Sequence, residues 1–156
     1  MNKHYKTLEL DKILEMLAKE IPFDEGAALA LELEPSHDIS EVRYLLRQTY
    51  DAHMLIGRFG SPSMGGLKNI TSPLKRAEAG GVLMFSELLQ ISRVLAVIRG
   101  LKDWKARSAG IETVLDEFFN LLVPNKYLEE KINLCILSDE EMSDNASKEL
   151  SIIRKK

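Results

Sequence analysis

The sequence has little of what disulfide scaffolds and membrane proteins need. Its 156 residues include one cysteine, Cys135, which cannot form a disulfide within the chain. With no paired histidine or asparagine evident in the sequence, we expect this thiol to be an inert packing group. No apolar run approaches the roughly 18 residues that span a bilayer, and residues 1–6 are not followed by an apolar stretch of signal-peptide length. We therefore expect a cytoplasmic protein without a membrane partner.

Patterns that bind metals, bind phosphate or carry out catalysis are also missing. The three histidines, His4, His37 and His53, are scattered and do not form a ligand pair at helical spacing. The stretch 60–66 is rich in glycine but lacks the G-x-x-x-x-G-K-[ST] pattern of a phosphate-binding loop. The acidic stretch 139–144 lacks the spacing and central glycine of a calcium loop. We predict no catalytic residue, no metal site and no cofactor in this chain, which is therefore not expected to be an enzyme by itself.

What the sequence does contain is typical of a globular chain. Hydrophobic residues make up 45% and charged residues 29% of the sequence, which is enough to build a core. The length favours a single domain over residues 1–156. The net charge of −3 divides into −4 for residues 1–36, +5 for 37–110 and −4 for 111–156. The basic middle either faces nucleic acid or is an ordinary solvated surface, and the charge pattern alone leaves both interpretations open.

Periodicity and capping signals predict one helix after another. A first helix carries the apolar residues Leu8, Ile13, Leu14 and Leu17. Further helices are expected from the cap Asp24 to a residue before Pro35, from the N-cap Asp38 to near Gly57 or Gly60, from Ser72 to Gly80, from Ser86 past Leu101, over 114–122 and over 127–136. The helix after Ser86 is apolar around most of its circumference, so we place it at the centre. The prediction is an all-α antiparallel helical bundle.

Two expectations concern the last part of the chain. The segment 135–144 passes from apolar residues to a polar turn, so one short β-hairpin near 135–144 is a plausible exception to the helical pattern. Residues 145–156 then have the pattern of the first turns of a helix, with Leu150 and Ile153 three apart. A helix of fewer than about 12 residues is marginal alone in water. We expect this segment to be the stub of a longer helix and the chain to be a piece of a larger protein.

One group of basic residues is a candidate binding site. It consists of Arg93, Arg99, Lys102, Lys105 and Arg107, which lie on the predicted central helix and just beyond it. Such a cluster is able to neutralise phosphates and would bind nucleic acid without reading its sequence. The alternative is that these cations stabilise a helix carboxyl end. Lys75 with Arg76, and 154–156, are weaker candidates of the same kind.

Several stretches of the sequence resemble one bacterial family. Residues 8–14, 30–35 with 38–42, 60–67 with 74–83, and 144–150 with 153–154 are similar, in this order, to sequences of the MutS-two proteins, the second subfamily of MutS-type ATPases. The likeness is weakest over 104–111. It departs from the family pattern at Lys148, where the family often has proline. No single motif is decisive, and the ordered set carries the resemblance.

The resemblance implies a role by position. This chain is similar to the N-terminal part of the core or lever region, and its last residues resemble the start of the long lever helix. In the family this region leads to a coiled-coil clamp, a dimerising ATPase domain and a nuclease-like Smr domain. The family is linked to suppression of recombination on branched DNA and to the splitting of stalled ribosomes. ATP and Mg²⁺ are expected in the parent protein, but none of the residues that bind them is present here.

These implications give two hypotheses. In the first, the chain is a non-catalytic helical segment that couples the absent ATPase domain to an absent clamp that grips DNA or the ribosome. Its partners would be the other domains of its own chain, with a homodimer expected for the parent. In the alternative, the basic middle segment is itself a module that binds nucleic acid or ribosomal RNA. The resemblance does not decide whether DNA or the ribosome is the substrate.

Overall fold

The computed structural model describes residues 3–154, and its regular secondary structure is almost entirely helical. Its helices are α1 (Lys3–Thr7), α2 (Leu10–Lys19), α3 (Asp24–Leu31), α4 (Ile39–Phe59), α5 (Thr71–Glu78), α6 (Phe85–Ala106), α7 (Asp116–Leu121), α8 (Lys126–Cys135) and α9 (Lys148–Arg154). Within the described residues there is no sheet, only one isolated β-bridge. The prediction of an all-α helical fold is confirmed.

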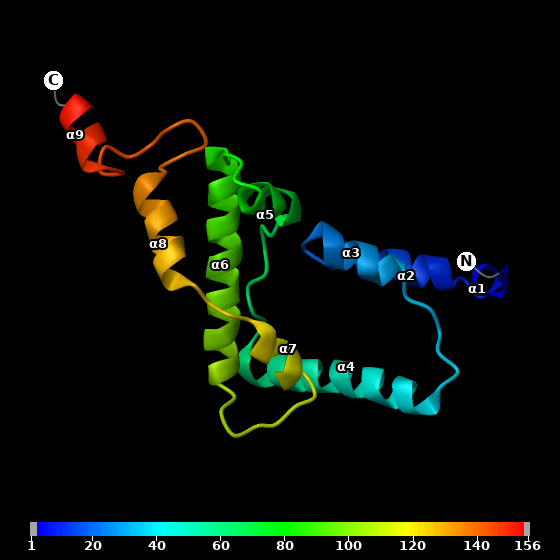
Figure 1. Cartoon of the computed structure of the whole chain (residues 1–156). Coiled ribbons are helices and arrows are strands. Elements are labelled where there is room, and N and C mark those ends of the chain that lie inside the picture. Colours follow the sequence, from blue (N-terminus) through cyan, green and yellow to red (C-terminus); the bar gives the residue numbers. More distant parts are fainter. Residues whose placement is uncertain (1–2, 155–156) are drawn as a thin grey trace.

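Two pairs of helices supply most of the packing between elements. Helices α2 and α3 form a hairpin near the N-terminus, and α6 lies against α8 (Figure 1). Helix α4 runs crosswise to α6 and joins these two parts of the molecule (Figure 1). The arrangement is therefore an open one, in which the crosswise α4 separates two small packed units.

The main core lies between α6 and α8. Ile91 of α6, Ile132 of α8 and Ile136 just beyond it are buried together, and α5 residues do not take part. Leu88, Leu89 and Leu95 of α6 pack around this group, as do Ile70, Leu83, Phe85 and Cys135. The predicted central helix is thus a core element, and Cys135 is a packing residue.

The first predicted helix is divided in two. Glu9 has φ of 58°, in the left-handed region that residues with a Cβ rarely adopt, and it separates α1 from α2. Leu14 of α2 is buried, but Leu8 is 78% exposed. The predicted apolar stripe is therefore wrong, because the helix is broken at Glu9 and Ile13 and Leu17 of α2 are also exposed, at 59% and 42%.

The helix starts were predicted with mixed success. Asp38 caps α4 as expected, its Oδ1 accepting from the Ser40 N–H at 2.7 Å. The predicted caps Ser72 and Ser86 are each two residues too late, since the N-caps are Ile70 and Met84 and other side chains accept the free N–H groups. Asn69 Oδ1 accepts from the N–H of Thr71, and a Glu87 carboxylate oxygen accepts from the N–H of Met84, both at 2.8 Å.

The expected hairpin is reduced to a turn closed by a single antiparallel bridge between Ile136 and Met142. The Ser143 N–H donates to the Cys135 carbonyl at 2.8 Å, which holds the two sides together. Helix α9 follows as predicted, and Arg154 at its end donates to Asp144 Oδ1 at 2.6 Å. Lys155 and Lys156, which belong to a weaker basic candidate, lie outside the described residues. None of the helices over 3–154 is long and apolar enough to cross a membrane.

Candidate functional site

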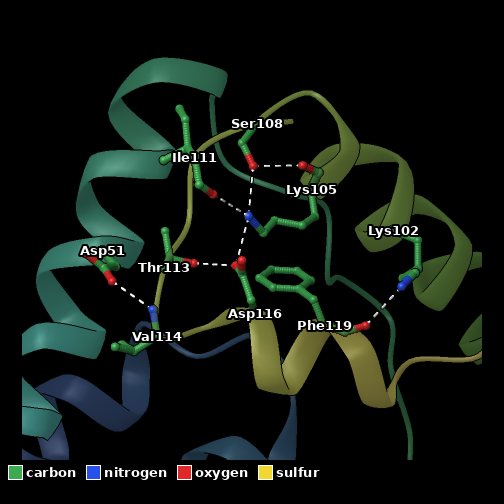
Figure 2. A network of polar contacts seen from close by, with 9 residues as sticks. All are labelled: Asp51, Lys102, Lys105, Ser108, Ile111, Thr113, Val114, Asp116 and Phe119. Atoms are coloured by element: carbon green, nitrogen blue, oxygen red, sulfur yellow. Dashed lines mark hydrogen bonds and ion pairs between the residues drawn. The ribbon is translucent and has the colours of Figure 1, made fainter.

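Lys105, in the last turn of α6, is the centre of a polar network that we call the joint: Asp51, Lys105, Ser108, Thr113 and Asp116. The Lys105 ammonium lies 2.9 Å from Asp116 Oδ1, and it donates to Ser108 Oγ at 3.1 Å and to the Ile111 carbonyl at 3.2 Å. Its side chain is only 16% exposed. Figure 2 shows that these partners come from the loop after α6 and from the start of α7. Lys105 therefore holds the end of α6, the loop and α7 in one arrangement.

Asp116 is the anionic side of the joint. Its Oδ1 also accepts from the Thr113 hydroxyl at 2.6 Å. The bond from Thr113, followed by the bond from Lys105, holds the pKa of the Asp116 carboxyl below its ordinary value. Asp116 is therefore a carboxylate at neutral pH, which keeps the contact with the Lys105 ammonium fully charged.

Asp51 connects α4 to the same loop. It is completely buried, and its Oδ2 accepts from the Val114 N–H at 3.0 Å. Its other oxygen lies 2.9 Å from Nε of Arg47, one turn earlier on α4. A buried carboxylate requires such partners, because leaving one unpaired is costly. Asp51 thus fixes the crosswise helix α4 to the segment that leads into α7 (Figure 2).

Arg99 and Lys102 are also engaged within the chain. The Arg99 guanidinium forms a two-pronged pair with the buried Glu129 of α8, at 3.0 and 2.8 Å. This pairing lowers the pKa of the Glu129 carboxyl and raises that of Arg99. Lys102 donates to the Phe119 carbonyl in the last turns of α7 at 3.2 Å. Both residues therefore tie α6 to its neighbouring helices.

Arg93 and Arg107 are in a different situation, because both are exposed and neither has a hydrogen-bond or ion-pair partner among the described residues. They line a groove of 1040 Å³ between α6 and the loop 60–68. The two arginines are 14 residues apart, close to four helical turns, so they share one face of the helix. We call this feature the α6 groove.

Trp104 holds the loop wall of the α6 groove near the C-terminal end of α6. The Trp104 indole N–H donates to the Gly60 carbonyl at 2.8 Å, and the ring is buried with its centroid 6.0 Å from that of Phe119. Farther along, the Arg93 side chain reaches the loop, since a Cβ at Gly66 would come within 2.6 Å of Arg93 Nη1. The glycine-rich stretch is thus a groove wall, and the φ of 75° at Gly66 favours glycine there.

The five predicted site residues therefore separate into two sets. Arg99, Lys102 and Lys105 face α7 and α8, whereas Arg93 and Arg107 face the α6 groove. Whether any of them binds nucleic acid stays a prediction. Of the weaker candidates, Arg76 pairs with Glu87. Sequence reasoning missed Lys68, which lines the groove from the loop. The spacing of 14 residues between Arg93 and Arg107 was the one signal in the sequence that could have grouped these two arginines apart from the rest.

Metal-binding groups were sought over residues 3–154, and no cluster of three histidine, cysteine or carboxylate side chains is present there. The acidic turn 138–141 is exposed and its carboxylates do not converge. The arrangement offers two kinds of cation. Arg99, Lys102 and Lys105 are bound to acceptors within the chain, whereas Arg93 and Arg107 are exposed to solvent.

Comparisons with known proteins give a consistent result. The chain is 41% identical over 155 residues to endonuclease MutS2 of Ruminiclostridium cellulolyticum, covering 98% of this chain and 20% of that protein. The chain is similar, over nearly all of its own length, to a part of MutS2 proteins. It is 40% identical to endonuclease MutS2 of Agathobacter rectalis over 99% of its length, and 36% identical to that of Acetivibrio thermocellus over 98%, again covering 20% of each. It thus spans about a fifth of the length of the MutS2 relatives it matches. No family model matches the chain.

Proposed function

We propose that this chain is a non-catalytic framework segment of a MutS2-type protein. In this role it couples an ATPase domain elsewhere in the protein to a clamp that engages DNA or the ribosome. The MutS2 relatives are named endonucleases, and we assign nuclease and ATPase chemistry to the parts of such a protein that this chain does not cover. The homodimer and the ribosomal partner belong to the same proposal.

The proposal rests on the amount of surface that this fold leaves open. The accessible surface is 11701 Å² for a mass of 17.6 kDa. A compact monomer of this mass would expose only about 7,900 Å². An excess of this size is expected of a segment that completes its packing against other parts of a larger assembly.

Part of the open surface is apolar, for example on the helices α2, α3 and α4. In the hairpin of α2 and α3, Ile13 is 59%, Met16 63% and Leu29 66% exposed. On α4 the same holds for Leu46 and Tyr50, at 64% and 61%. Burying side chains of this kind away from water is favourable, by about 25 cal/mol for each Å² of apolar surface. They favour contact with further domains of the same protein.

Transmission of a movement requires firm connections inside the segment. The joint supplies one, since Asp51 and Lys105 fix α4, α6 and α7 through buried or half-buried charged contacts. The Arg99–Glu129 pair supplies another between α6 and α8. Packed helices held in this way move as rigid bodies, so a displacement at one end of α6 would be transmitted to the other end.

The test is made in a full-length MutS2 protein that contains this chain. Asp51→Asn weakens the joint but preserves the shape of the side chain, and Asp103→Asn changes an exposed carboxylate of α6 as the matched control. We expect Asp51→Asn to keep basal ATP hydrolysis and to lose its response to DNA or ribosomes. An unchanged response in a folded Asp51→Asn protein would contradict the proposal.

A further inference from the structure

The α6 groove carries open positive charge that the framework role does not use. Arg93 and Arg107 lie on its helix wall and Lys68 on its loop wall, all exposed and without a salt-bridge partner in the described part of the chain. Asp139 is the one acidic residue that lines it. We propose that the α6 groove binds the sugar–phosphate backbone of a single nucleic-acid strand.

The arrangement of the charges favours a polyanion of extended form. Arg93 and Arg107 are about 21 Å apart along the axis of α6, at 1.5 Å for each residue. Between them the helix wall presents Val97 and Gly100, and no carboxylate interrupts the line. Cations spaced along a straight channel match an anion whose charges repeat along its length, such as a phosphodiester chain.

The shape of the groove selects one strand over two. Its 1040 Å³ extend along α6 from Ser86 to Arg107, about 32 Å of helix. The space is therefore narrow, whereas a DNA duplex is wide enough that its major groove alone measures about 12 Å. A single strand is able to lie along the channel with its phosphates toward the arginines.

The lining residues indicate recognition of the backbone and not of the bases. Arginine offers a planar fork of donors that matches phosphate oxygens, and Ser61, Ser63 and Ser86 add hydroxyl groups. The one tryptophan of the groove, Trp104, is buried and bonded to Gly60, so it is not free to stack on a base. Binding is accordingly expected to depend on salt and to be indifferent to sequence.

Fluorescence anisotropy with the 156-residue chain tests this proposal. The probe is a labelled oligothymidylate or oligouridylate, titrated over a range of salt concentrations. We expect binding at low salt that weakens as salt rises. Each of Arg93→Ala and Arg107→Ala should make the slope of log K against log salt shallower by roughly 0.7, the value for one phosphate of a single strand. The absence of binding at low salt would overturn the proposal.

Three further variants separate the groove from general surface charge. Arg43→Ala removes an exposed arginine of α4 that does not line the groove, and it should leave the slope unchanged. Gly100→Leu places an uncharged side chain where a Cβ meets nothing within 4 Å, so it should obstruct binding without altering the charge. Asp139→Asn should strengthen binding. Equal effects of Arg43→Ala and Arg93→Ala would show diffuse attraction and overturn the proposal.

Competitors define the ligand class. A DNA duplex and a polyglutamate peptide of matched charge are added to the bound probe. Weak displacement by both supports a site for a single strand. Displacement by the peptide at the same charge concentration would identify an acidic protein segment as the ligand, and equal displacement by the duplex would remove the preference for one strand. Thermal melting of every variant ensures that only folded protein is compared.

Discussion

Arg99 and Glu129 form a two-pronged ion pair across the interface of α6 and α8, with Nε 3.0 Å from Oε2 and Nη2 2.8 Å from Oε1. The glutamate side chain is only 9% exposed and the arginine 40% exposed. Glu129→Gln keeps the size of the side chain but removes its charge. We expect this change to lower the free energy of unfolding by about 1.5 kcal/mol, the lower end of the range for a hydrogen bond to a charged group, because the arginine is partly solvated. Urea unfolding followed by circular dichroism measures it.

The neighbouring residue is the control for this prediction. Glu130 is 65% exposed and its oxygen lies 3.5 Å from the Lys126 ammonium, as in an ordinary surface pair. Glu130→Gln should alter the free energy of unfolding by less than about 0.5 kcal/mol. Equal losses in the two variants would mean that the buried pair contributes no more than a solvated one.

The stability of the chain should fall in acid. The bond from Arg99 lowers the pKa of Glu129, and the bonds from Thr113 and Lys105 lower that of Asp116. Each carboxyl is therefore harder to protonate in the folded than in the unfolded chain. The contribution to stability is complete above the unfolded pKa values, near 4, and is lost as the pH falls through the lower folded values.

Melting temperatures measured from neutral pH to below about pH 4, where the carboxyls of the unfolded chain titrate, check this dependence. Glu129→Gln cannot gain a proton at this position, so its melting temperature should fall less steeply in acid than that of the unsubstituted chain. Parallel curves for the two proteins would show that Glu129 does not contribute to the acid sensitivity.

The joint leads to a prediction about mobility. Lys105→Met removes the donor that serves Asp116, Ser108 and the Ile111 carbonyl, while keeping a chain of similar length. Its half-buried partners would then lack a charged donor, at a cost of about 2 kcal/mol. Hydrogen exchange of the loop between α6 and α7 should become faster, with little change in α2 and α3. Lys126→Met, at a 69% exposed position, is the control, and equal protection of the loop in both variants would contradict the prediction.

The helices could be predicted from the sequence because their signals are local. The capping carboxylate of Asp38 and the glycines after α5 act within a few residues, and both are found as expected. The break at Glu9 could not be predicted, since nothing in its composition marks a residue with φ of 58°.

The site was harder to predict for a different reason. Periodicity places Arg93 and Arg107 on one face of a helix, but it does not say which face a neighbouring helix covers. The partners of Arg99 and Lys102 are 30 and 17 residues away in the sequence. Contacts over such separations depend on the tertiary fold, so only the structure distinguishes the cations that are neutralised from those that stay open.

Two helical glycines should respond to alanine in opposite directions. At Gly100 of α6 an added Cβ meets nothing within 4 Å, so Gly100→Ala gains the helix propensity of alanine, roughly 0.5–1 kcal/mol. At Gly26 of α3 the same atom would lie 2.7 Å from the Phe23 ring and 2.8 Å from Ile21 Cγ2. Relieving such overlap costs roughly 1–3 kcal/mol, more than the propensity returns.

Thermal melting of the two variants decides this prediction, because both replace glycine by alanine inside a helix and change composition identically. Gly100→Ala should melt above the unsubstituted chain and Gly26→Ala below it, by roughly 2–4 °C for each kcal/mol. A higher melting temperature for Gly26→Ala would show that Phe23 moves aside at no cost. The turn between α2 and α3 would then be loosely packed, and the hairpin would owe its geometry to the partners that cover its exposed leucine and methionine side chains.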